Sequence, residues 1–305
     1  MSDRQNEIRQ REGHNMHEKG NILLEIIVFL SLTIILSTLV YIPIIQARTT
    51  TGGQYDWTGL LMLAPGLAAV ITYLVFEHSL RPIGWRPGKV LYLILGLVIP
   101  LIYCLFEYGL VWLTGRGKYN GQFPPDFSTF MMTMLFNGTL SALLEEVAWR
   151  GFLVPKMIKL TSFSKTALTT GLIWAIWHYP LIIFTDVRFG KTPLWYSLAC
   201  FTVFVVGVSF AATWLRLKSG SVWSAALLHG SQNVFMLHVF NALTTDNGRT
   251  WLLLGEYGAI TAIMGLLLAI LFWSLRTRLP ETYQTRARKN MVESRPTPAP
   301  GESGS

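Results

Sequence analysis

The chain contains eight runs of about 20 apolar residues, and this feature constrains its fold more than any other. A helix needs about 20 residues to cross a hydrocarbon layer that is roughly 30 Å thick. The runs cover residues 22–45, 57–77, 90–113, 128–154, 166–184, 194–214, 220–241 and 253–275. Because backbone polar groups in lipid must be satisfied within the protein, we predict that each run is a transmembrane helix.

The composition agrees with an all-α polytopic membrane protein. Hydrophobic residues make up 51% of the chain and charged residues 14%, whereas soluble domains are about 25% charged. We therefore predict a polar N-terminal tail over 1–21, an eight-helix domain over 22–275, and a basic C-terminal tail over 276–305. That last tail is rich in Pro, Ser, Thr and Gly and is predicted to be disordered. If the protein is prokaryotic, its membrane is the plasma membrane.

The positions of the basic residues predict how the chain is oriented. The tails and the even-numbered loops hold 18 lysines and arginines, and the odd-numbered loops hold 6. Positive residues accumulate on the cytoplasmic side of membrane proteins, so both termini are predicted to be cytoplasmic. Cations in such places contact anionic lipid headgroups. We therefore interpret the net charge of +8 as membrane topology and predict no binding of nucleic acid.

Three of the runs carry ionisable residues that are costly within a bilayer and hence are candidates for a functional site. The fourth run contains Glu145, Glu146 and Arg150, the fifth Trp174 and His178, and the seventh His229 and Asn233. Helical spacing places Glu146 and Arg150 on one face, where they can form an ion pair. Glu145 is rotated by about 100° from Glu146 and points elsewhere.

Four of these side chains are predicted to lie at a similar depth. At about 1.5 Å of rise per residue, Glu145, His178, His229 and Asn233 lie roughly 14 to 20 Å from the cytoplasmic ends of their helices. A carboxylate with a neutral imidazole can activate water, and a second imidazole and an amide can stabilise an oxyanion. Glu145, His178 and His229 could instead hold a zinc ion, because two histidines and a carboxylate form hydrolytic zinc sites. Either alternative indicates hydrolysis of an amide bond within the membrane.

The three motifs, EExxxR, an aromatic residue four positions before a histidine, and HxxxN, resemble those of the CAAX protease and bacteriocin-processing family. They occur in the family's order over about 128–240, the core of the predicted domain. The resemblance implies an intramembrane endopeptidase whose substrate is a membrane-associated peptide or protein, in some members lipid-modified at its C-terminus. It further implies that Glu145 activates water with His178 and that His229 and Asn233 stabilise the oxyanion. In this mechanism no metal is required, although the family is often described as metalloproteases. Trp174, which walls the pocket, departs from the phenylalanine that is more usual there.

Two alternatives remain open from the sequence. Gly207-Val-Ser209 suggests a serine intramembrane protease that uses Ser209, although this serine is predicted to lie only about 8 Å from the cytoplasmic end of its helix. A protein without proteolytic activity is the other alternative: a membrane binding or immunity protein, or a transporter in which Glu145 carries a proton.

Overall fold

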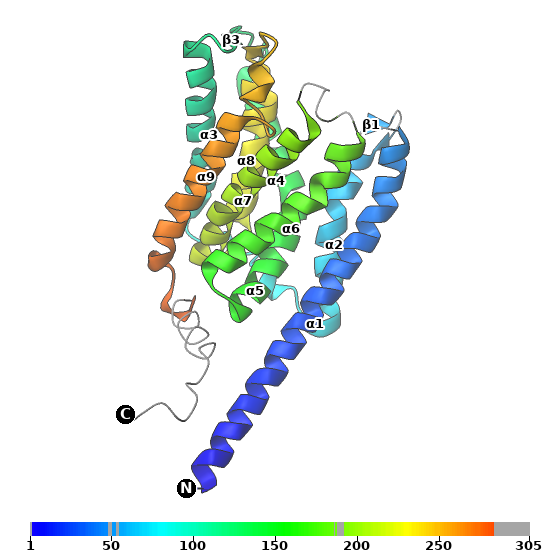
Figure 1. Ribbon diagram of the computed structural model, residues 1–305, viewed down its shortest axis with the longest axis vertical. Coiled ribbons are helices and arrows are strands. Elements are labelled where there is room, and N and C mark those ends of the chain that lie inside the picture. Colours follow the sequence, from blue (N-terminus) through cyan, green and yellow to red (C-terminus); the bar gives the residue numbers. More distant parts are fainter. Residues whose placement is uncertain (1, 48–50, 53–54, 186, 188–191, 284–305) are drawn as a thin grey trace, which may run out of the picture.

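A computed structural model describes residues 2–47, 51–52, 55–185, 187 and 192–283. It is a bundle of long helices (Figure 1). The helices are α1 (Ser2–Ala47), α2 (Trp57–Phe76), α3 (Val90–Leu113), α4 (Phe127–Glu146), α5 (Val154–Leu160), α6 (Phe163–Phe184), α7 (Leu194–Ser219), α8 (Trp223–Asn233) and α9 (Ala259–Ser274). Two π-helical segments, Val147–Leu153 and Val234–Phe240, continue α4 and α8.

The extended structure in the described residues is confined to short pairs in loops. Strands β1 (Thr51–Gly52) and β2 (Tyr55–Asp56) pair antiparallel with Thr51 opposite Asp56. Strands β3 (Lys118–Tyr119) and β4 (Thr244–Thr245) pair with Lys118 opposite Thr245. Short 3₁₀ turns lie at Arg81–Ile83, Thr250–Leu252 and Leu275–Arg278.

The predicted all-α membrane fold is confirmed, and seven helices in the described part of the chain are long and apolar enough to span a membrane. The spans lie in Met16–Ala47, Trp57–Phe76, Val90–Leu113, Phe127–Leu160, Phe163–Phe184, Leu194–Ser219 and Ala259–Arg278. The predicted run 220–241 is also helical, as α8 and its π-helical continuation, but it is not among the seven. It carries His229, Gln232 and Asn233, which make it less apolar than the others.

The structure moves one predicted boundary and adds local structure near both ends of the chain. The last span begins at Ala259 and not at 253, since residues 253–258 form a loop with Gly255 at a positive φ of 77°. The polar stretch 1–21 is helical from Ser2 and continues into the first span as α1. In the C-terminal tail, Leu275–Arg278 forms a 3₁₀ turn, while the prediction of disorder for 284–305 falls outside the described residues.

The bundle is organised around α7 and α8. Helix α7 is the most buried of the seven candidate spans and packs between α6 and α9, whereas α8 packs against α3 and α4. Helix α1 covers α2 and projects beyond the bundle at the end where α9 also finishes (Figure 1). Large apolar side chains such as Met132 and Phe136 face outward, as expected for a surface in contact with lipid.

Two cations that were counted as cytoplasmic charges are in fact buried structural groups. Lys156 on α5 pairs with both Glu25 and Glu77. Arg216 on α7 donates from Nε to the Arg150 carbonyl at 2.9 Å and from Nη2 to the Pro82 carbonyl at 2.8 Å. Each therefore fixes helices to one another at the end of the bundle and is unavailable to headgroups.

Candidate active site

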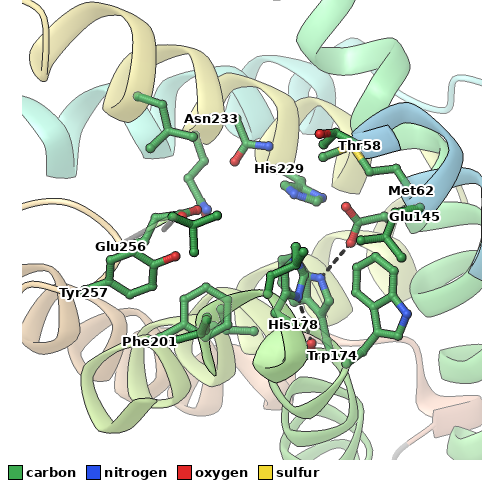
Figure 2. Close-up of a pocket in the computed structure, with 18 of the residues that line it drawn as sticks. Thr58, Met62, Glu145, Trp174, His178, Phe201, His229, Asn233, Glu256 and Tyr257 are labelled. Atoms are coloured by element: carbon green, nitrogen blue, oxygen red, sulfur yellow. Dashed lines mark hydrogen bonds between the residues drawn. The ribbon is translucent and has the colours of Figure 1, made fainter. Parts of the chain in front are cut away.

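A cavity of about 600 Å³ lies inside the bundle, and the four side chains predicted to converge all line it (Figure 2). Glu145 comes from α4, His178 from α6, and His229 and Asn233 from α8. Trp174 lines the same cavity. The predicted convergence of an acid, two imidazoles and an amide is thus confirmed as geometry.

The Glu145 carboxylate is almost completely buried and is held by two indoles. Its Oε2 atom accepts a hydrogen bond from Trp174 Nε1 at 2.9 Å and a longer one from Trp149 Nε1 at 3.4 Å. Trp174 was predicted to be only a wall. It is also a hydrogen-bond donor to the candidate base, which the more usual phenylalanine could not be.

His178 is oriented by its own helix. Its Nδ1 atom lies 3.0 Å from the Trp174 carbonyl oxygen, and a carbonyl only accepts, so the proton of the neutral ring is on Nδ1. The ring packs edge-on to Trp177, with centroids 4.7 Å apart, and against Phe201 at 5.3 Å. The unprotonated Nε2 is therefore the atom available to water or substrate.

His229 is oriented by Glu146. The ring atom Nδ1 lies 3.1 Å from Glu146 Oε1, and the same oxygen accepts a hydrogen bond from Arg150 Nη1 at 2.8 Å. The predicted ion pair between Glu146 and Arg150 is thus confirmed, but Glu146 also fixes the tilt of His229. The Arg150 guanidinium lies 4.5 Å from the centroid of the Trp174 ring. Arg150 therefore contacts both Glu146 and the indole that donates to Glu145.

The motifs on α4 and α8 each run into a widened helical turn, and Arg150 of the first motif lies within that turn. One π-helical segment starts directly after Glu146 and the other directly after Asn233. Such turns change the direction of side chains along a helix and occur frequently at functional sites. The first segment is held by Tyr73, whose hydroxyl donates to the Gly151 carbonyl at 3.0 Å, and by Arg216, which donates to the Arg150 carbonyl.

Glycines bring α4 and α8 together beside the site. A Cβ atom on Gly230 would lie 2.6 Å from Thr139 Cα, and one on Gly138 would lie 2.8 Å from a Val234 methyl group. Only glycine fits such a close approach of two backbones. His229 is therefore held next to the helix that carries both glutamates.

The structure adds a second carboxylate to the cavity, from the loop 253–258. Glu256 and Tyr257 both line the cavity, together with Asn241 and Gln232. Burial, aided by the negative charge of Glu145 and opposed by His229, raises the pKa of Glu256 to about 7. Sequence reasoning missed Glu256, although it is an ionisable residue inside a predicted span. Gly255 and Gly258 on either side of it were the signal of a loop.

The serine alternative does not fit the structure. Ser209 is fully buried between α6 and α7, where its hydroxyl donates to the Ala167 carbonyl at 2.9 Å. It is not among the residues that line the cavity.

The donor set also does not fit a metal centre. Within the described residues, no three His, Cys, Asp or Glu side chains are grouped as ligands of one ion, and this includes Glu145, His178 and His229.

The fold and the cavity define a polytopic helical membrane protein in which a carboxylate, two imidazoles and an amide line one internal cavity. Residues 127–235 match the family model of the type II CAAX prenyl endopeptidase Rce1-like proteins. The chain is also 25% identical over 204 residues to CAAX prenyl protease 2 of Methanococcus maripaludis, covering 60% of this chain and 74% of that protein. The resemblance predicted from the three motifs is thus confirmed: the part of the chain that carries them is similar to the type II CAAX prenyl endopeptidases.

Proposed function

We propose that this protein is an intramembrane endopeptidase that cleaves a membrane-associated peptide near the cytoplasmic face. The substrate is a chain with a lipid-modified C-terminal segment, by analogy with the archaeal relative. The observation that carries the proposal is the shared cavity of Glu145, His178, His229 and Asn233. The apolar side chains that line the same cavity suit a substrate that arrives through lipid.

In the proposed reaction, Glu145 takes a proton from a water molecule that His178 Nε2 helps to orient. The hydroxide adds to the scissile carbonyl carbon. The proton then passes from Glu145 to the amide nitrogen as the C–N bond breaks, so that the products are a carboxylic acid and a free amine. The two indoles that donate to Glu145 Oε2 hold the carboxylate in one orientation throughout.

The developing oxyanion is stabilised by Asn233 and His229 in this proposal. His229 can donate from Nε2 while Nδ1–H stays bonded to Glu146 only if the ring carries both protons. The adjacent negative charge of Glu146 favours this charged ring. Glu146 is hence a positioning residue that acts through His229.

The test is proteolysis by purified protein in lipid nanodiscs. A panel of membrane peptides, with and without an isoprenoid on a C-terminal cysteine, is incubated with the protein and the fragments are identified by mass spectrometry. We expect one defined cut, with an unchanged rate after treatment with a chelator. A folded protein that cuts no peptide would contradict the proposal, and uptake measured on the same sample would then test the transporter alternative. Loss of the cut with chelator and recovery with zinc would contradict the metal-free route.

A further inference from the structure

Glu256 lies in the cavity but has no part in the proposed reaction. It comes from the loop before α9, outside the segment 127–235 that matches the family model. Figure 2 shows Glu256 and Tyr257 at the opposite end of the cavity from Glu145, with His178 and His229 between them. A peptide bond placed at the catalytic group would thus have neighbouring side chains that extend toward Glu256.

The loop that carries Glu256 is fixed in place. Gly258 donates its N–H to the Gly255 carbonyl at 2.9 Å, and Ile260 donates to the Leu253 carbonyl at 3.0 Å. The Tyr257 ring lies 5.9 Å from Phe201, which itself packs against His178. Glu256 therefore belongs to an ordered part of the cavity wall. Phe201 packs against both its neighbour Tyr257 and the His178 ring.

Among the described residues, the carboxylate of Glu256 has no hydrogen-bond partner. The described residues that line the cavity include no lysine or arginine. Arg150, which balances Glu146, lies behind Trp174 and does not line the cavity. The end of the cavity at Glu256 thus presents an acidic hydrogen-bond acceptor to whatever binds there.

We propose that Glu256 is a specificity-determining residue that selects basic or hydrogen-bond-donating side chains near the scissile bond and disfavours acidic ones. This proposal rests on the proposed peptidase function. Like charges brought together in a partly desolvated site repel strongly and exclude wrong partners. An acidic side chain opposite Glu256 is therefore expected to weaken both binding and cleavage.

The test uses peptides that differ only by Lys or Glu at each position flanking the scissile bond. The ratio of kcat/KM for the Lys peptide to that for the Glu peptide is measured for the wild type, Glu256→Gln and Glu256→Lys. At a pH above the raised pKa of Glu256, which is about 7, the carboxyl is mostly ionised. At the position that meets residue 256, we then expect about a tenfold preference for Lys in the wild type. It should fall to near one in Glu256→Gln and invert in Glu256→Lys. Glu107→Gln is the matched control, because Glu107 is a buried carboxylate on α3 that does not line the cavity.

In a second arm, the Kd values of fluorescent Lys and Glu peptides are measured in nanodiscs, in the Glu145→Gln background. The ratio of the two affinities is compared between Glu256 and its two variants. This arm reports on selection even if the wild type cuts nothing, so the failure of the proposed function and that of this inference are distinguishable. Ratios that stay within twofold of the wild type in both Glu256 variants would overturn the inference. An equal shift in Glu107→Gln would also overturn it.

Discussion

Two adjacent glutamates, Glu145 and Glu146, have different surroundings, and this is the central feature at the scale of single residues. Glu145 faces the cavity and, among the described residues, accepts hydrogen bonds from the neutral indoles of Trp174 and Trp149. Glu146 faces the protein, where it holds Arg150 and His229. A rotation of about 100° between neighbours on a helix produces this division, and the sequence alone predicts it.

Loss of the charge on Glu146 is expected to destabilise the fold. Glu146→Gln leaves the Arg150 guanidinium buried without its carboxylate, and breaking a buried pair costs about 3–5 kcal/mol. Thermal unfolding in detergent should show a lower Tm for Glu146→Gln, whereas the isosteric Glu145→Gln should unfold close to the wild-type temperature. Equal transition temperatures for the two variants would contradict the roles assigned here.

Trp174→Phe tests whether the indole N–H matters to the candidate base. The ring remains as a wall, but Glu145 loses its shorter hydrogen bond of 2.9 Å. Since a hydrogen bond to a charged group contributes about 1.5–3 kcal/mol, we expect kcat to fall roughly tenfold while the protein stays folded. An unchanged kcat would mean that Trp174 only fills space.

At the scale of helices, the close contact of α4 with α8 and the π-helical segments set the geometry of the site. The sequence contains the glycines Gly138 and Gly230 but does not show that they lie at a helix contact, because this depends on which helix packs against them. The π-helical segments could not be predicted from the sequence either. The spacing from Glu146 to Arg150 fits an ordinary helix, but the widened turn begins at Val147 and is held by Tyr73 and Arg216 from other helices.

Gly230→Ala is expected to separate α4 from α8 and lower both stability and activity. The new Cβ would lie 2.6 Å from Thr139 Cα, and overpacking of this kind costs about 1–3 kcal/mol. Gly109→Ala on α3 is the matched control, because its Cβ would meet nothing within 4 Å. That variant should be neutral or slightly more stable. A Gly230→Ala protein as active and as stable as Gly109→Ala would contradict the role of this contact.

At the scale of the whole molecule, the sequence predicted the fold class and the convergence of the site better than it predicted the boundaries. Apolar runs and motif spacing are local features of the sequence, so they can be recognised without knowledge of the tertiary structure. The loop with Glu256 was read as part of a span because its flanking residues are apolar. Lys156 and Arg216 were read as free surface charges because their partners, Glu25, Glu77 and the backbone of Arg150, lie far away in sequence.

The orientation of the bundle stays a prediction from the charge distribution. Single cysteines introduced near the start of α1 and after α9 should react with a membrane-impermeant maleimide only once right-side-out cells are permeabilised. Native Cys104 and Cys200 are both buried, so their background labelling should be low. Labelling of both new cysteines in intact cells would reverse the predicted orientation.

The proposed role of Glu145 as the general base is tested most directly by the cleavage rate of Glu145→Gln in nanodiscs, measured beside the wild type on one lipid-modified peptide. The variant keeps the shape of the side chain but loses the carboxylate that we propose as the base. We predict that cleavage falls by at least about a thousandfold, within the range of losses seen when a key catalytic group is removed, while Tm stays near that of the wild type. Cleavage by Glu145→Gln at the wild-type rate would show that Glu145 is not the base.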